Sequence, residues 1–324
     1  MNAEDLNETA TLTAKFHAIR EEIHKAVVGQ DEAVSAVLIG LLCDGHVLLE
    51  GVPGTAKTLL VKSLAEAVSL DHKRVQFTPD LMPGDLTGSL IYNSSNASFS
   101  FRAGPIFTNI LLADEINRTP PKTQAALLEA MAERQVTVDG EPRTLQSPFI
   151  VVATQNPIEY EGTYSLPEAQ LDRFLLKVTL PLPTPEVEVE MLRRHANHFD
   201  PRDLSTADIN AAASKEDILQ ARAQVQQIEA HQMVLNYIVE IVQATRTSPF
   251  TQLGVSPRGA TALLQVSRAW AWLNGRSYVL PDDVKALAIP TLAHRIQLQS
   301  EAELDGLTRE QVLTSILNTI PVPR

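Results

Sequence analysis

The sequence has one cysteine, Cys43, among 324 residues, so the chain cannot form an internal disulfide. A single free thiol is typical of a reducing compartment. No apolar run approaches the length of a membrane-spanning helix, and residues 1–10 are polar and acidic, unlike a secretory signal peptide. We therefore expect a soluble, cytoplasmic protein without membrane insertion.

Basic charge and aromatic side chains are also scarce. The 27 Lys and Arg are outnumbered by 39 Asp and Glu, which gives a net charge of −12, and aromatic residues make up 5% of the chain. A nucleic-acid binder needs a basic surface, and one that binds single strands also needs aromatic rings for base stacking. A local basic loop is compatible with this balance, but general nucleic-acid binding is not expected. The eight histidines show no metal-ligand spacing.

A Gly-rich loop at 51–58 lies between an apolar segment that predicts a strand, 47–49, and a segment with the apolar spacing of a helix. Its pattern is that of the phosphate-binding loop, G-x-x-x-x-G-K-[ST], except that Ala56 replaces the second glycine. Backbone N–H groups of such a loop surround a polyphosphate, while Lys57 reaches the β- and γ-phosphates and the Thr58 hydroxyl binds Mg2+. The predicted nucleotide-binding residues are Gly51, Val52, Pro53, Gly54, Thr55, Ala56, Lys57 and Thr58. The flanking strand and helix disfavour the alternative, an incidental Gly-rich turn.

Polar side chains end two further apolar segments that predict buried strands. Asp114 and Glu115 follow the run 110–113, and Asn156 follows the run 149–153. An acid at this place can hold Mg2+, and its neighbour can polarise the attacking water, so we assign Asp114 to the metal and Glu115 to the base. Asn156 can position the water or contact the γ-phosphate. The alternatives are an acidic pair at a strand end and a plain Asn-Pro turn.

Two arginines and one turn are weaker candidates. Arg173 precedes the last predicted strand and can neutralise transition-state charge, or it can form a surface salt bridge; spacing alone does not decide. Arg258 lies in the first turn of a helix, where the dipole disfavours a cation, which suggests contact with a phosphate. Gly29 and Gln30 precede the first strand and can contact adenine, or they can form a plain turn.

Strands that alternate with helices predict a parallel α/β sheet flanked by helices. The proline-rich segment 181–185 predicts a boundary between an α/β domain, 1–183, and an α-helical domain, 184–324. Two hairpins are predicted, one within 89–101 and one within 136–145, the latter turning at Asp139-Gly140. We also expect Thr119 to cap the helix that Pro120 and Pro121 open.

Several stretches together resemble the AAA+ ATPases, and among them the MoxR family of the helix-2-insert clade, over nearly the whole chain. They are Gly-Val-Pro-Gly-Thr-Ala-Lys-Thr (51–58), Phe-Arg-Ala-Gly-Pro-Ile-Phe (101–107), Leu-Leu-Ala-Asp-Glu-Ile-Asn-Arg (111–118), Ala-Thr-Gln-Asn-Pro (153–157), Leu-Pro-Glu-Ala-Gln-Leu-Asp-Arg-Phe (166–174) and Ser-Pro-Arg (256–258). The resemblance implies an AAA+ P-loop NTPase core with a C-terminal α-helical lid domain. It also implies a Walker A motif at 51–58 and a Walker B motif at Asp114-Glu115.

The resemblance further assigns sensor 1 to Asn156 and sensor 2 to Arg258. It implies that Arg173 is an arginine finger that reaches the ATP of a neighbouring subunit, and that Arg118 is a second interface residue. The two hairpins match the helix-2 insert and the pre-sensor-1 hairpin of the clade, and would face the pore of a hexameric ring.

The implied function is Mg-dependent ATP hydrolysis that drives chaperone-like remodelling or activation of a client protein. Such activation can include insertion of a metal cofactor into a metalloenzyme, with a von Willebrand A-domain protein as partner. The alternatives are a nucleic-acid motor or loader, in which Arg102, Arg134 and Arg143 would make the hairpins locally basic, and a small-molecule kinase built on a phosphate loop.

Overall fold

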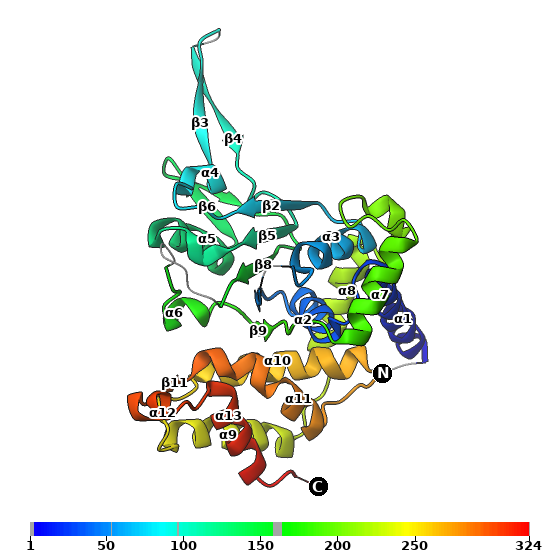
Figure 1. Cartoon of the computed structure of the whole chain (residues 1–324), viewed down its shortest axis with the longest axis vertical. Coiled ribbons are helices and arrows are strands. Elements are labelled where there is room, and N and C mark those ends of the chain that lie inside the picture. The colour runs from blue at the N-terminus through cyan, green and yellow to red at the C-terminus, as the bar shows by residue number, and fades with distance from the viewer. Residues whose placement is uncertain (1–2, 53, 96, 158–163, 324) are drawn as a thin grey trace.

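The fold is seen in a computed structural model that describes residues 3–52, 54–95, 97–157 and 164–323. A five-stranded parallel sheet in the order β2-β5-β8-β1-β9 forms its centre (Figure 1). The strands are β1 (Val47–Glu50), β2 (His72–Gln76), β5 (Ile110–Asp114), β8 (Ile150–Gln155) and β9 (Leu176–Thr179). The predicted parallel α/β sheet is therefore confirmed.

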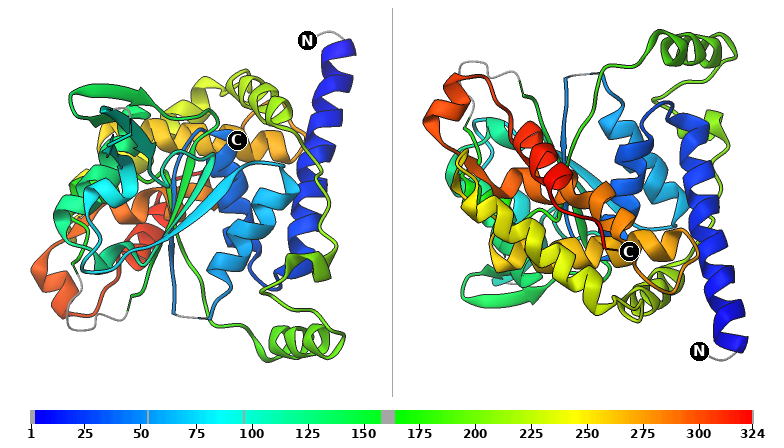
Figure 2. Two further views of the ribbon diagram at one scale, coloured as in Figure 1. Left: turned by 90° about the horizontal axis from the view of Figure 1, so that it is seen from above. Right: turned by 90° about the horizontal axis from the view of Figure 1, so that it is seen from below.

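Alternate side chains of the three inner strands, β1, β5 and β8, enter two different hydrophobic cores, because successive residues of a strand point to opposite faces. In β8, Ile150 and Val152 face one core and Val151 and Ala153 face the other. The first core is covered by helices α1 (Ala3–Ala26), α2 (Asp31–Leu42) and α3 (Lys57–Ala67), and the second by α5 (Pro121–Glu133). Figure 2 shows the long α1 along one side of the molecule, in contact with α3. Burial on both faces explains why these strands are continuous apolar runs.

A second group of helices lies against the β9 edge of the sheet (Figure 1). It comprises α9 (Gln232–Thr247), α10 (Pro257–Leu273), α11 (Pro281–Leu292), α12 (Ser300–Leu304) and α13 (Arg309–Thr319), with the short helix η3 (Ala293–Arg295) and strands β10 (Thr251–Leu253) and β11 (Gln297–Leu298). Its apolar side chains continue the first core without a break.

The segment between the sheet and this group forms α7 (Pro185–Ala196), η2 (Leu204–Ala207) and α8 (Lys215–Gln226). Helix α8 contacts α1 and α2 as well as α10, so it packs on both parts of the molecule. The predicted boundary at residue 184 stays a prediction.

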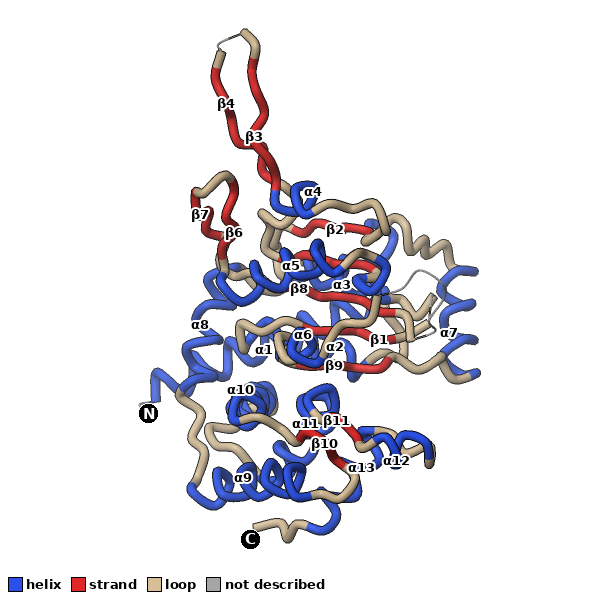
Figure 3. Tube along the Cα trace, turned by 90° about the vertical axis from the view of Figure 1, so that its left-hand side faces the viewer, coloured by secondary structure: helices blue, strands red, loops and turns tan. Residues whose placement is uncertain are grey.

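Both predicted hairpins form, and both project from the end of the sheet opposite the helical group (Figure 3). The longer one follows the short helix α4 (Pro83–Thr87) and consists of β3 (Gly88–Asn93) and β4 (Ser98–Ala103); the other consists of β6 (Gln135–Val138) and β7 (Glu141–Thr144). The two hairpins touch, because the guanidinium carbon of Arg143 lies 3.9 Å from the ring centroid of Phe101.

The predicted cap of α5 is wrong in detail. Helix α5 begins at Pro121, and Pro120 is the residue before it. The Thr119 hydroxyl instead donates to the carbonyl of Thr78, at 2.9 Å, and thereby ties the start of α5 to the segment that leads into the first hairpin. Among the described residues, no helix is both long and apolar enough to cross a bilayer.

Candidate active site

The 51–58 loop connects β1 to α3 at the carboxyl edge of the sheet, where parallel α/β sheets place their ligands. Lys57 is the first residue of α3, and Ala56 before it has φ 60°, in the left-handed region. That conformation explains why the generic motif has glycine here. The Thr55 hydroxyl donates to the Val52 carbonyl at 2.9 Å and closes the turn. Pro53, a predicted loop residue, lies outside the described residues.

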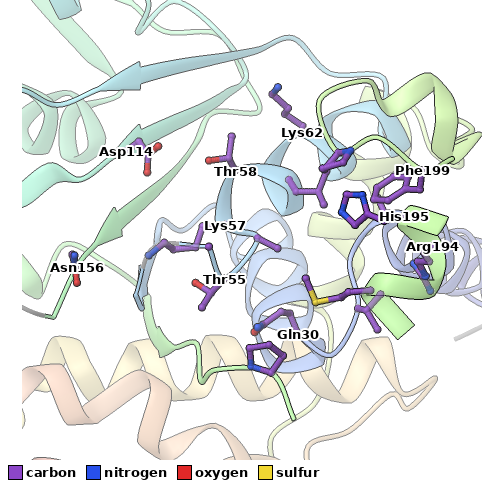
Figure 4. Close-up of a pocket in the computed structure, with 18 of the residues that line it drawn as sticks. Gln30, Thr55, Lys57, Thr58, Lys62, Asp114, Asn156, Arg194, His195 and Phe199 are labelled. Atoms are coloured by element: carbon purple, nitrogen blue, oxygen red, sulfur yellow. The ribbon is translucent and has the colours of Figure 1, made fainter. Parts of the chain in front are cut away.

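A cavity of about 440 Å³ opens beside this loop, a size that suits a small-molecule ligand (Figure 4). It is lined by Gln30 at the start of α2, by the loop, by the ends of β5 and β8, and by residues in and after α7. The lining residues include Gln30, Gly54, Thr55, Ala56, Lys57, Thr58, Asp114, Glu115, Asn156, Met191, Arg194, His195 and Phe199. Sequence positions far apart thus meet at one place.

Lys57 reaches back over its own loop. Its ammonium donates to the carbonyls of Gly51 and of Val52, the latter at 3.3 Å. Burial lowers the pKa of Lys57, while the charges of Asp114, Glu115 and Glu50 oppose this shift. The ammonium therefore lies within the field of both candidate catalytic carboxylates.

The Asp114 carboxylate, in a residue only 8% exposed, is held from both neighbouring strands. Its Oδ1 accepts from the Thr154 hydroxyl of β8 at 2.6 Å, and its Oδ2 accepts from Nε and Nη2 of Arg74 on β2 at 3.1 and 2.6 Å. Asp114 and Thr58 line the same cavity, and a carboxylate with a hydroxyl is the hard oxygen donor set that Mg2+ takes beside phosphate oxygens. The two residues therefore fit the predicted magnesium site. Among the described residues, no cluster of three or more His, Cys, Asp and Glu offers a metal site made of protein ligands alone.

Glu115 adopts φ 57° and ψ 51°, an uncommon backbone conformation for a residue other than glycine. Its N–H donates to the Thr154 hydroxyl oxygen at 2.8 Å, which fixes that conformation. Its Oε2 accepts from Gln76 Nε2 at 2.7 Å and lies 3.1 Å from Arg118 Nε. Arg118, predicted as an interface residue, thus contacts the candidate base of its own chain.

Asn156 is buried and lines the cavity at the end of β8, and its role as a phosphate sensor stays a prediction. Gln30 also lines it, whereas Gly29 is not among its described lining residues. Gly29 has φ 69° and packs against Val187 of α7, where a Cβ would lie 2.7 Å from Val187 Cγ1. The glycine therefore permits the close approach of α7 to the cavity.

Arg173 and Arg258 lie elsewhere, around a second cavity of about 400 Å³ at the amino ends of β1 and β9. Its charged lining residues include Arg134, Asp172, Arg173, Arg258 and Arg295. Strand β1 separates the two cavities, and the five steps from His46 to Gly51 span roughly 16 Å at about 3.3 Å per residue. Lys57, Thr58, Asp114, Glu115 and Asn156 are therefore brought together, and the two arginines are not brought to them.

Comparison with known proteins identifies the family. Residues 46–176 match the model of the ATPase family associated with various cellular activities (AAA), and residues 243–316 match that of the AAA lid domain. The chain is 40% identical to "Chaperone MoxR1" of Mycobacterium tuberculosis, over 97% of this chain and 84% of that protein. It is 33% identical to "Protein MoxR" of Paracoccus denitrificans, over 96% of this chain and 97% of that protein.

The chain belongs to the MoxR family of AAA ATPases. A Bacillus subtilis protein, YeaC, is 48% identical over 94% of this chain and 93% of its own length. A crystal structure of a protein from Cytophaga hutchinsonii, described as a candidate ATPase, matches 98% of each chain with a TM-score of 0.90 and 42% identity. The predicted family, the AAA+ fold with its helical lid and the assignment as an ATPase are confirmed.

Two groups of residues in this MoxR-family site were not predicted from the sequence. Arg74 and Gln76 alternate with buried Val75 on β2, and their role depends on β2 lying next to β5, which no local pattern reveals. Met191, Arg194 and His195 of α7, together with Phe199, wall the cavity on the side of Gln30. Arg194 is fixed there, because it donates to the carbonyls of His24 and Lys25, each at 2.7 Å.

Proposed function

We propose that this MoxR-family chain is a Mg-dependent ATPase that works as a hexameric ring of identical subunits and remodels or activates a client protein. The main support for this proposal is that Arg173 and Arg258 lie at the edge of the sheet opposite to Lys57. Transition-state charge at the γ-phosphate calls for an arginine, and these two cannot reach the ATP bound by their own loop. A neighbouring subunit with its carboxyl edge facing them would complete the site. Since ATP is the substrate, we place the activity in the cytoplasm.

Within one subunit, each residue has a separate task. The loop N–H groups and Lys57 bind the phosphates, and Thr58 with Asp114 would hold Mg2+, which neutralises phosphate charge when bound. Glu115 accepts a proton from the attacking water, and Asn156 orients that water from the adjacent strand. The pocket formed by Gln30 and α7 receives the nucleoside.

The client would be engaged by the longer hairpin. Tyr92 and Phe99 lie on its two strands with ring centroids 5.2 Å apart, and Phe99 is 68% exposed. Exposed aromatic pairs of this kind suit contact with another polypeptide. A chaperone role is supported by the name of the M. tuberculosis relative. A von Willebrand A-domain partner and insertion of a metal cofactor into a client enzyme are the finer parts of this proposal.

Mixing of two inactive variants tests the shared site. Lys57→Ala subunits lack ATP binding but keep Arg173, and Arg173→Ala subunits keep ATP binding but lack the finger. We expect mixtures of the two to recover hydrolysis, because each Arg173→Ala subunit can obtain the arginine from a Lys57→Ala neighbour. No recovery at any mixing ratio would show that Arg173 acts within its own chain or not at all.

The remodelling role is tested by capture of client proteins on ATP-loaded Glu115→Gln, with and without nuclease. Capture that depends on nucleic acid would contradict this role.

A further inference from the structure

A buried arginine of the helical lid, Arg295 in η3, binds the segment that carries Arg173. Its side chain is 3% exposed. Nε donates to Asp172 Oδ1 at 2.7 Å, and the other two nitrogens donate to the carbonyls of Phe174 and Leu175 at 2.8 and 3.2 Å. The planar guanidinium suits this task, because its donors point in fixed directions and meet several acceptors at once.

These acceptors lie on both sides of Arg173 in the chain. The backbone of the preceding residue contributes as well, since the carbonyl of Asp172 accepts from Arg295 Nη2 at 3.4 Å. The carbonyl of Phe174 also lies 3.0 Å from Nε2 of His294, the neighbour of Arg295. Residues 172–175 are thereby attached to the lid, although they precede β9 of the sheet.

The same carboxylate connects to the second arginine. Oδ2 of Asp172 lies 3.8 Å from Nε of Arg258, whose side chain is 63% exposed, while Oδ1 binds the buried Arg295. Gly259, next to Arg258 in α10, allows close packing there, since a Cβ on it would lie 3.1 Å from Cδ of Arg295. Arg295 therefore contacts the supports of both cations: the exposed Arg258, and the half-buried Arg173, whose Nη1 donates to the Leu128 carbonyl of α5.

We propose that Arg295 is a positioning residue for ATP hydrolysis in the adjacent subunit: it holds the 172–175 segment and the first turn of α10 in one rigid unit, which presents Arg173 and Arg258 together. The inference rests on the proposed function, in which these two arginines act on a neighbour's ATP. Loss of the Arg295 contacts is therefore expected to misplace Arg173 and Arg258 together.

The test uses Arg295→Lys in the full-length protein. Lysine keeps the positive charge near Asp172 but cannot bind the carboxylate and the carbonyls together. We expect kcat to fall at least about tenfold, since small misplacement of a catalytic group is costly, with KM and the dissociation constant of a fluorescent ATP analogue within about twofold of the parent. Mixing with Lys57→Ala subunits, which supply intact arginines, is expected to restore hydrolysis. Should the lysine variant not fold, Asp172→Asn gives the same test, because it weakens the link from the other side.

Arg276→Lys is the matched control. Arg276 forms a comparable ion pair with buried Asp283, at 2.6 Å from Nη1 to Oδ2, but contacts no residue of 172–175. We expect Arg276→Lys to lower the melting temperature. Any loss of kcat in this variant should not be restored by mixing with Lys57→Ala subunits. A parental kcat for Arg295→Lys overturns the inference. The inference is also overturned if mixing with Lys57→Ala subunits restores hydrolysis to Arg173→Ala but not to Arg295→Lys. If neither Arg295→Lys nor Arg173→Ala recovers hydrolysis on mixing, the proposed function itself is overturned, and the inference with it.

Discussion

The guanidinium of Arg74 donates two hydrogen bonds to one oxygen of Asp114, from Nη2 at 2.6 Å and from Nε at 3.1 Å. Its Nη2 also donates to Gln76 Oε1 at 2.8 Å, and Gln76 in turn donates to Glu115 at 2.7 Å. Both carboxylates at the end of β5 are thus connected to β2. Since β2 leads through α4 into the longer hairpin, this strand joins the proposed client surface to the catalytic acids.

The contact with Arg74 should affect the metal. Arg74→Met removes a cation from the Asp114 carboxylate, so Mg2+ would no longer share that oxygen with a guanidinium. We expect the Mg2+ concentration for half-maximal ATP hydrolysis to fall several-fold, since a half-exposed ion pair contributes up to about 1 kcal/mol. The rate is measured against Mg2+ at saturating ATP. Lys73→Met is the control, because Lys73 carries the same charge on β2 but donates to the Phe107 carbonyl. An unchanged or higher Mg2+ requirement for Arg74→Met would contradict the prediction.

Glu115→Gln should separate binding from turnover. The amide keeps the size of the side chain and loses the carboxylate that accepts the proton, so hydrolysis is expected to fall by at least about 100-fold. Binding of ATP, measured by equilibrium titration, should be retained, because the loop and Lys57 are unchanged. Glu129→Gln, on the exposed face of α5, serves as the control and should hydrolyse ATP normally. Normal turnover by Glu115→Gln would remove Glu115 from the mechanism.

The features that the sequence predicted are those that depend on neighbouring residues in the chain. The 51–58 loop and the Asp114-Glu115 pair each lie directly after an apolar strand, so their place at the carboxyl edge follows from strand direction alone. The position of Arg258 depends on how the lid packs on β9, and that of Arg74 depends on strand order, so neither could be read locally. The Thr119 cap failed because a tertiary acceptor, the Thr78 carbonyl, takes its hydroxyl.

Ala56→Gly should stabilise the fold. Alanine at φ 60° costs about 1–2 kcal/mol relative to its ordinary conformations, whereas glycine adopts this region freely but loses about 0.5–1 kcal/mol of chain entropy on folding. The net gain in the free energy of unfolding should be about 0.5–1 kcal/mol, measured by urea titration. Ala125→Gly, at an exposed position within α5, is the control and should lose about 1 kcal/mol. A less stable Ala56→Gly protein would show that the loop needs the methyl group.

The buried imidazole of His46 should make stability depend on pH. Its Nδ1 accepts from the Val151 N–H at 2.9 Å and its Nε2 lies 3.2 Å from the Met131 carbonyl; burial, helped by the charge of Arg134, lowers its pKa to about 3. In the unfolded chain this histidine takes up a proton below about pH 6.5, so its share of stability is present above that pH and is lost at about 1.4 kcal/mol per pH unit towards pH 3. His46→Asn, which keeps an acceptor for Val151 but does not titrate, should therefore show a shallower decline than the parent in urea titrations at pH 7.5, 6.5, 5.5 and 4.5. Parallel declines for the two proteins would mean that the folded protein accepts a proton at His46 as readily as the unfolded chain.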